Sequence, residues 1–233
     1  AGGRVLASAR VPVRGLPGSE PLASEIDPDA WLSGLALVTA QLGLRDRDRL
    51  KGVVVSGNGP TLVAVDAAGE PVGPALGWQD RRATGEAGLV AEFSGSFLDE
   101  TFYLPKALWL MHHRPVEYAR TRWFLPSAEF VDFVLTGHAH RVNSTPAFAE
   151  LFWNESAIHR VGLDPDRFPP FVEPGDRVGT VSDRAAEALT AYGDKAVPIL
   201  REMTTLRSSK GSRSASSPSR ENSGSSSRNS TPR

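Results

Sequence analysis

The sequence contains no cysteine among its 233 residues, and several other features are also missing. Without cysteine the chain can form neither a disulfide framework nor a thiolate metal site, and cysteine usage says nothing about its redox compartment. The sequence has no apolar run long enough to cross a membrane, and no basic segment followed by an apolar one at its N-terminus. It also lacks an internal repeat of fixed period and sustained heptads. We therefore expect a soluble, cytoplasmic protein with no membrane partner.

Apolar side chains are almost absent from residues 204–233, which are mostly serine and arginine. Such a segment cannot bury a core, so we expect a disordered Ser/Arg-rich tail. The tail is basic, and the formal net charge of -1 for the whole chain therefore conceals a more acidic remainder. A shifted reading frame or a damaged gene would explain the tail, and so would a segment that binds nucleic acid through its phosphates. The first explanation is favoured because the tail has no aromatic residue for base stacking, so nucleic acid is not an expected partner.

Two β-branched runs, Val53–Val55 and Leu62–Val65, are bounded by turn residues, a pattern typical of buried neighbouring strands. The turn between them is rich in glycine and asparagine, which lets the backbone approach whatever lies above the sheet edge. A polar loop built around Trp78 follows at Gly77–Arg82. A further short strand is expected within Arg4–Val13, with its partner strand before Ala1.

Helix signals alternate with these strands. Asp27 and Pro28 are an N-cap and a first-turn proline, and Trp31, Leu35, Val38 and Leu42 follow at helical spacing up to Gly43. Strands mixed with helices of this length predict a layered α/β domain. Three later helices are expected: one from Pro105 to Pro115 with Leu104, Leu108 and Met111 on one face, one around Phe130, Phe133 and Val134 ending at Gly137, and one from Ser182 to Tyr192 capped by Gly193.

Several motifs occur in the order found in the FGGY family of carbohydrate kinases, and the chain resembles the N-terminal domain of that family from Ala1 to about Leu200. The family includes xylulokinases, gluconokinases and glycerol kinases. The matching pieces are Gly3–Ala7, Ser56–Asn58, Trp78–Arg82, Leu104–Trp109, Leu135–Gly137, Phe168–Pro170 and Val178–Gly179.

The resemblance implies the actin-like, ribonuclease-H-like fold, N-terminal domain only, at residues 1–203. It also implies transfer of the ATP γ-phosphoryl group to a hydroxyl of a sugar or polyol, with ATP and Mg²⁺ as cofactors. Such a transfer depends on positioning and charge neutralisation rather than on covalent chemistry. An indole offers a flat apolar face to the C–H side of a polyol, while amide and hydroxyl groups bind its O–H groups. By position, Trp78, Asn58 and Thr61 fit these roles, whereas Asp80 and Arg81 either touch the substrate or, the favoured option, tie the loop together.

The chain also departs from the family pattern. Gly59 and Pro60 stand where glycerol kinases carry Arg-Glu and xylulokinases carry Met-His, so the substrate stays open. The family's first strand, with its Asp-x-Gly-Thr phosphate loop, is expected before Ala1, and its catalytic carboxylate is expected beyond Val197–Leu200. We therefore assign no catalytic residue and expect the chain as given to be inactive as a kinase. The alternative is a noncatalytic sugar-binding or regulatory module, and a homodimer is left open.

Three other residues carry weaker signals. His138 and His140 alternate as a metal pair would, but no further ligand stands at suitable spacing, so we expect a solvated turn and no metal site. Lys106 is the one charged residue at the start of its helix, and Asp99 or Glu100 is its expected partner.

Overall fold

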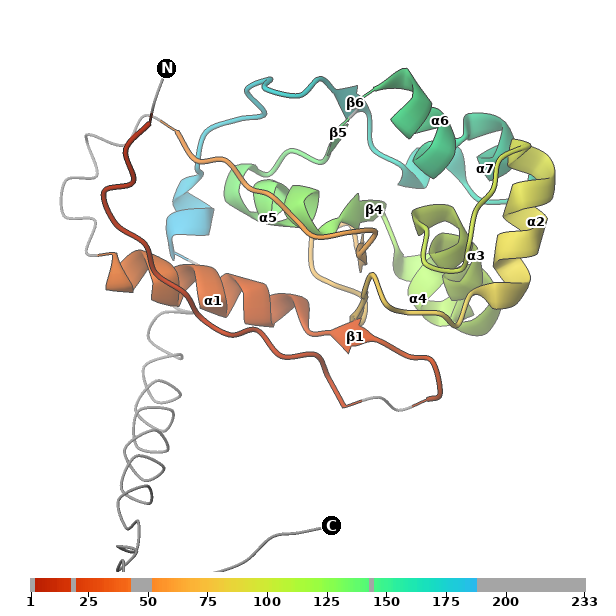
Figure 1. The fold of residues 1–233 in the computed structure, drawn as a ribbon, viewed down its shortest axis with the longest axis horizontal. Coiled ribbons are helices and arrows are strands. Elements are labelled where there is room, and N and C mark those ends of the chain that lie inside the picture. Colours follow the sequence, from red (N-terminus) through yellow and green to blue (C-terminus); the bar gives the residue numbers. More distant parts are fainter. Residues whose placement is uncertain (1–2, 18–19, 43–51, 143–144, 188–233) are drawn as a thin grey trace, which may run out of the picture. The chain divides into compact units, whose positions relative to one another are not determined.

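The structure is a computed structural model that describes residues 3–17, 20–42, 52–142 and 145–187 (Figure 1). Its larger sheet has four strands in the order β1-β3-β2-β4, and every neighbouring pair is antiparallel. A second sheet pairs β5 with β6 in parallel. The strands are β1 (Glu25–Ile26), β2 (Leu62–Val65), β3 (Ala75–Leu76), β4 (Trp123–Pro126), β5 (Arg141–Val142) and β6 (Phe171–Val172).

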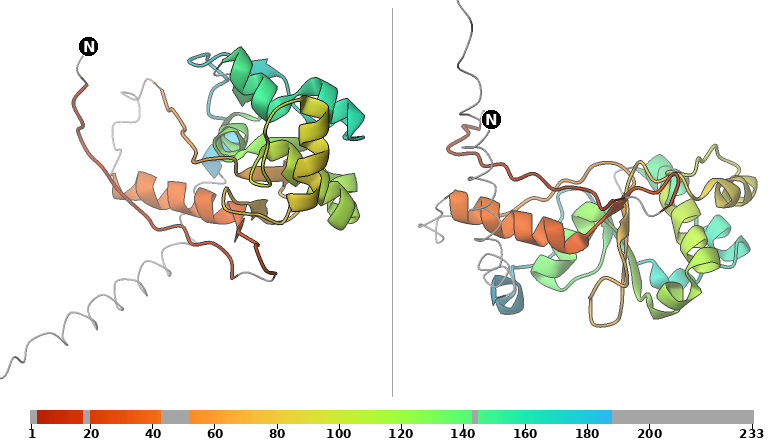
Figure 2. Two further views of the ribbon diagram at one scale, coloured as in Figure 1. Left: turned by 45° about the vertical axis from the view of Figure 1, so that its right-hand side comes forward. Right: turned by 90° about the horizontal axis from the view of Figure 1, so that it is seen from below.

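Helices cover both faces of the larger sheet, as the two views of Figure 2 show. The first three helices are α1 (Pro28–Gln41), α2 (Thr84–Ser94) and α3 (Tyr103–His113). The next four are α4 (Pro115–Arg120), α5 (Ser127–Thr136), α6 (Pro146–Trp153) and α7 (Glu155–Arg160). A short 3₁₀ helix, η2, follows at Pro165–Arg167. None of the helices in the described ranges is both long and apolar enough to span a membrane.

Successive side chains of β2 point to opposite faces of the sheet, because strand side chains alternate. Leu62 packs with α2, α3, α6 and α7 in one hydrophobic cluster, whereas Val63 and Val65 pack with Leu32 of α1 and Phe130 of α5 in another. The strand is therefore buried on both sides, and the arrangement confirms the predicted layered α/β domain.

The helix predictions are mostly confirmed. Asp27 caps α1 by accepting a hydrogen bond from the Asp29 N–H at 3.0 Å, and α5 ends at Gly137 in the left-handed conformation. The face of α1 was predicted less well, because its buried side chains include Leu32 and Leu37 while Trp31 is only half-buried. Of the helix expected from Ser182, residues 183–187 are helical and the rest lie outside the described residues, as do the final strand and the tail at 204–233.

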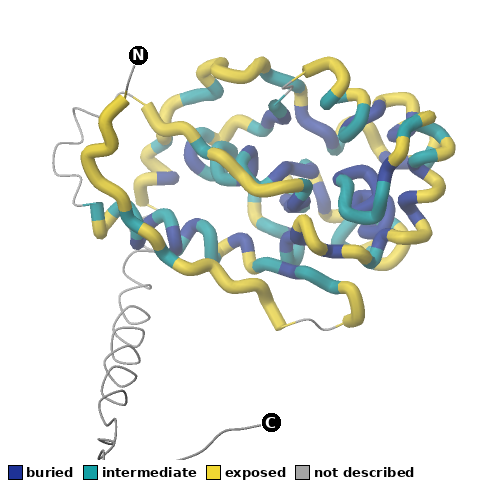
Figure 3. The backbone as a smooth tube through the Cα atoms, viewed as in Figure 1, coloured by how far each residue is buried: buried dark blue, intermediate teal, exposed yellow. Residues whose placement is uncertain are grey.

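Two predicted strands are wrong. Residues 3–13 and Val53–Val55 are not strands, and no described residue pairs with them as a strand. Leu6 is 81% exposed and Val54 is 95% exposed, and Figure 3 shows the N-terminal segment as an exposed tube. The physical reason is that an apolar, β-branched run becomes a strand only when a neighbour binds its N–H and C=O groups and covers its side chains.

Candidate functional site

The topology of the larger sheet brings two polar loops together. Loop A (residues 57–61) leads into β2, and loop B (residues 77–82) follows β3. Because β2 and β3 are antiparallel, with Leu62 opposite Leu76, the start of one strand lies beside the end of the other. Loops A and B are therefore neighbours at the same end of the two inner strands, although 15 residues separate Thr61 from Gly77.

Loop A is a tight turn that presses against Trp78. Gly59 has a φ of +59°, a conformation that favours glycine, and a Cβ atom at this position would lie 2.8 Å from the Trp78 Cβ. The Thr61 N–H donates to the Gly59 carbonyl at 2.8 Å. Backbone and indole thus approach more closely than a side chain on residue 59 would allow.

A buried network of charged side chains holds loop B on its interior side. Both carboxylate oxygens of Asp80 accept hydrogen bonds from Arg82, the shortest at 2.7 Å, and Oδ2 also accepts from the Ser24 N–H at 2.8 Å. Arg82 donates in addition to Glu25 Oε1 at 2.9 Å, and its guanidinium lies 4.3 Å from the centre of a Trp109 ring. Asp80 is only 1% exposed, so its carboxylate faces the protein interior.

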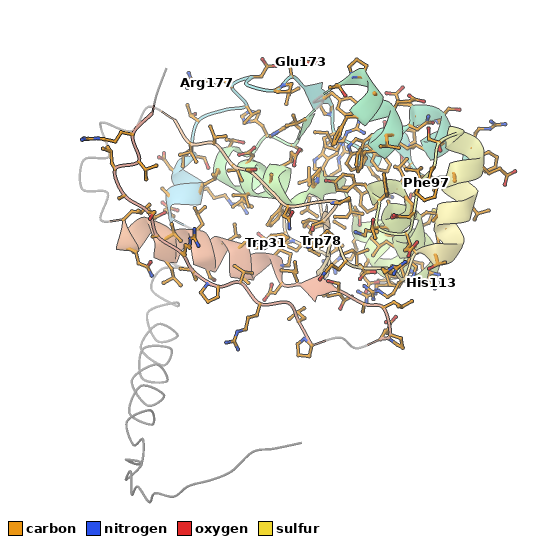
Figure 4. All side chains as sticks on the ribbon, in the orientation of Figure 1. Trp31, Trp78, Phe97, His113, Glu173 and Arg177 are labelled. Atoms are coloured by element: carbon orange, nitrogen blue, oxygen red, sulfur yellow. The ribbon has the colours of Figure 1, made fainter. Side chains whose placement is uncertain are left out.

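The remaining residues predicted at the site differ in exposure. Trp78 is 46% exposed and Asn58 is exposed, so both present side chains to solvent at adjacent loops, and Figure 4 labels Trp78 near the centre of the view. Thr61 is buried, and its hydroxyl lies 3.4 Å from the Asn58 carbonyl to which it donates. Arg81 is exposed and pairs with Glu100 at 2.6 Å.

Two residues of α3 reach the same loops and were not predicted to do so. The Lys106 ammonium donates to the Pro60 carbonyl at 2.5 Å and to the Gly77 carbonyl at 2.7 Å, and the Tyr103 hydroxyl donates to the Gly59 carbonyl at 3.4 Å. The expected pairing of Lys106 with a carboxylate is wrong. The signal that could have revealed its burial is its apolar surroundings in the sequence, because a lone cation inside an apolar helical segment must find polar partners in the interior.

The carboxylates proposed for Lys106 have other partners. Asp99 accepts from the Thr101 N–H at 2.8 Å, and Glu100 pairs with Arg81. Both therefore organise the segment between α2 and α3.

The expected solvated turn at the alternating histidines is wrong for His140. This side chain is buried, with Nε2 3.5 Å from Asp132 Oδ2, and the Asp132 carboxylate raises the pKa of the imidazole. His138 is exposed. Across residues 3–17, 20–42, 52–142 and 145–187, no three histidine or carboxylate side chains gather in a way that could hold a metal ion.

The site therefore combines an apolar surface with polar groups. The indole of Trp78 is accessible, its base is fixed against Gly59, and the Asn58 side chain is exposed on the neighbouring loop. An aromatic face beside hydrogen-bonding groups suits a small ligand with C–H and O–H faces.

Comparisons with known proteins agree with this arrangement. Residues 1–201 match the FGGY family of carbohydrate kinases, N-terminal domain. A xylulose kinase from Streptomyces coelicolor is 33% identical over 197 residues, which cover 78% of this chain and 40% of the relative. A xylulose kinase from Staphylococcus xylosus is 28% identical over 182 residues, covering 71% of this chain and 38% of the relative.

Solved structures show the same fold. The crystal structure of xylulose kinase from Rhodospirillum rubrum matches with a TM-score of 0.68 at 18% identity, over 81% of this chain and 43% of that one. Glycerol kinase from Plasmodium falciparum, solved with ADP, matches with a TM-score of 0.66 at 15% identity, over 79% of this chain and 42% of that one. These matches confirm the predicted actin-like fold class.

The chain spans about 40% of the length of the curated relatives it matches. The matching family domain is the N-terminal one and covers residues 1–201 of the 233. The chain therefore belongs to the FGGY family of carbohydrate kinases, of which it represents the N-terminal domain.

Proposed function

We propose that loops A and B form the sugar-binding site of an ATP-dependent sugar kinase, and that residues 1–203 are its sugar-binding domain. D-xylulose is the first candidate substrate, because several relatives are named xylulose kinases. Gly59 and Pro60 depart from the pattern of xylulokinases, so a related sugar or polyol is the next candidate.

The observation that carries this proposal is the position of Trp78. Trp78 is 46% exposed as a residue although its Cβ is packed against Gly59, so the side chain is held at its base and remains accessible. A fixed aromatic ring binds the C–H face of a sugar without losing much conformational entropy. The exposed amide of Asn58 can both donate and accept hydrogen bonds, as sugar hydroxyls require.

The other predicted site residues receive different roles. We assign Arg81 to the rim of the site, where its pair with Glu100 leaves it partly exposed. Asp80 and Thr61 hold the loops rather than touch the sugar, because both side chains are buried.

Phosphoryl transfer is proposed for the whole protein to which such a domain belongs. Bound ATP and Mg²⁺ would supply the transferred group and neutralise its charge. The described residues provide no cluster that fits the metal, so we derive no step through it. The cytoplasmic location expected from the sequence belongs to the same proposal.

Isothermal titration calorimetry of the purified chain with D-xylulose, glycerol and gluconate tests the binding site. We expect saturable binding of at least one of these ligands, and loss of that binding in Trp78→Ala. The matched control is Phe97→Ala, because Phe97 is an aromatic residue that is 83% exposed and that Figure 4 labels away from Trp78. Binding that survives Trp78→Ala, or that Phe97→Ala removes equally, would contradict the proposed site.

A noncatalytic sugar-binding module is the second candidate function. It is favoured by the fact that Asp80, Arg82 and Lys106 fix both loops through contacts within this chain. Release of ADP by the purified chain, measured with ATP, Mg²⁺ and the bound sugar, tests this second candidate. Sugar-dependent turnover would exclude the module and would contradict the expectation that this chain is inactive. Sugar binding without turnover is expected.

A further inference from the structure

Lys106 connects the two loops of the site from underneath. Its side chain is fully buried, and its ammonium donates to the Pro60 carbonyl of loop A and to the Gly77 carbonyl of loop B. The distances are 2.5 and 2.7 Å, at or below the short end of the range for N–H···O bonds. One side chain of α3 therefore bridges two segments that are distant in the sequence.

Burying the Lys106 amino group costs hydration free energy, so Lys106 does more than fill space in the interior. Its neighbours Leu104 and Ala107 on α3 are buried and apolar, and an apolar side chain of similar length would avoid the loss of hydration. Burial lowers the pKa of Lys106 to about 7, while the negative charges of Asp80 and Asp99 act in the opposite direction.

We propose that Lys106 is a positioning residue for sugar binding, which acts by holding the carbonyls of Pro60 and Gly77 at a fixed separation. Each carbonyl lies within two residues of a residue that is central to the proposed site. Gly77 directly precedes Trp78, and Pro60 lies two residues after Asn58. This inference rests on the proposed function. It means that Lys106 of α3 sets the distance between the Trp78 indole and the Asn58 amide.

The pairing of Leu62 with Leu76 joins the two loops at their base, and beyond that pairing Lys106 is the described side chain that hydrogen-bonds to both loops. The Tyr103 hydroxyl reaches only loop A, at the Gly59 carbonyl, and the Asp80 network reaches only loop B. The contact between Gly59 and Trp78 limits how closely the loops approach but does not hold them together. The Lys106 amino group instead donates a hydrogen bond to a carbonyl of each loop and so holds the two loops together.

The test compares Lys106→Met with the wild-type chain. Methionine keeps the length and apolar stem of lysine but cannot donate to either carbonyl. We expect the dissociation constant for the sugar probe, D-xylulose or whichever of glycerol and gluconate the wild type binds, to rise at least about tenfold. The matched control is Leu108→Met, which changes a buried residue of the same helix and leaves the bridge intact.

A second readout does not depend on sugar. Acrylamide quenching of Trp78, taken as the difference between each protein and the same protein with Trp78→Phe, reports how tightly loop B is held. We expect this quenching to increase in Lys106→Met and to stay unchanged in Leu108→Met.

A chemical rescue covers the case in which Lys106→Met does not fold. Since the chain has no cysteine, Lys106→Cys introduces its single thiol, which can be aminoethylated in denaturant before refolding to restore a lysine-like ammonium. We expect the aminoethylated protein to recover sugar affinity and wild-type quenching, and the unmodified protein to recover neither.

The possible outcomes are distinct. If the wild type binds sugar and Lys106→Met binds it equally well with unchanged Trp78 quenching, the inference is overturned while the proposed function stands. If aminoethylation fails to restore affinity and quenching, the inference is also overturned. If the wild type binds none of the three ligands, the proposed function itself fails, and a positioning role in sugar binding fails with it.

Discussion

Replacing Asp80 by alanine tests whether this carboxylate ties loop B to the protein or contacts the sugar. The change removes the acceptor of the Arg82 hydrogen bonds, of which the shortest is 2.7 Å, and of the Ser24 N–H at 2.8 Å. Removing one partner of a buried ion pair typically costs about 3–5 kcal/mol. Arg82 keeps its bond to Glu25, so we expect the lower end of that range, about 3 kcal/mol of unfolding free energy.

A loss of this size is large compared with the total stability of a domain, about 5–15 kcal/mol. Urea denaturation followed by circular dichroism and by tryptophan fluorescence measures it. Arg81→Ala is the matched control, because the Arg81 side chain is 63% exposed and its pair with Glu100 should contribute less than about 1 kcal/mol. A protein with Asp80→Ala that is as stable as wild type but has lost sugar affinity would refute this reasoning and would place the carboxylate against the substrate.

Three further changes probe the fold and the site. Gly59→Ala should lower the unfolding free energy by about 1–2 kcal/mol, because residue 59 has a positive φ, and denaturation measures this loss. The added Cβ should also displace Trp78 and change the tryptophan emission spectrum. An unchanged spectrum would contradict the close contact between Gly59 and Trp78. Phe124→Ala removes a fully buried ring from β4 and should cost about 3–5 kcal/mol in the same denaturation assay, whereas a loss below about 1 kcal/mol would show that this core is misassigned. His140→Gln tests a pH dependence: the pKa of His140 is raised by Asp132, so the stabilisation from this pair is present below the unfolded pKa and disappears as the pH rises through the folded pKa. The stability difference between wild type and His140→Gln should therefore be larger at about pH 5.5 than at about pH 8.5, and an equal difference at both would exclude the pair.

The helices were predictable because their signals are local. The N-cap at Asp27, the proline at residue 28 and the glycine at residue 137 determine where helices begin and end through bonds within a few residues. The pairing of strands was not predictable from such local signals. Val53–Val55 and Leu62–Val65 have similar composition, yet only the second run is a strand, because only it has strands on both sides.

The choice of Trp78 and Asn58 as sugar contacts stays a prediction, whereas the contacts that hold their loops come from the structure alone. Motif order was enough to select Trp78 and Asn58, and both are exposed on neighbouring loops. That Asp80 ties the loop together was the favoured interpretation of the sequence. Its link through Arg82 to Glu25 and the contact of Lys106 with Gly77 could not be inferred, because these residues lie far apart in the sequence.

The sequence by itself therefore determined the family, the layered α/β class and the candidate loops, since these follow from local signals and from the order of motifs. The tertiary structure decided which polar side chains of those loops face solvent and which hold them in place. The physical reason is that burial and hydrogen-bond pairing arise between distant segments, here between α3 and the two loops at the same end of the inner strands.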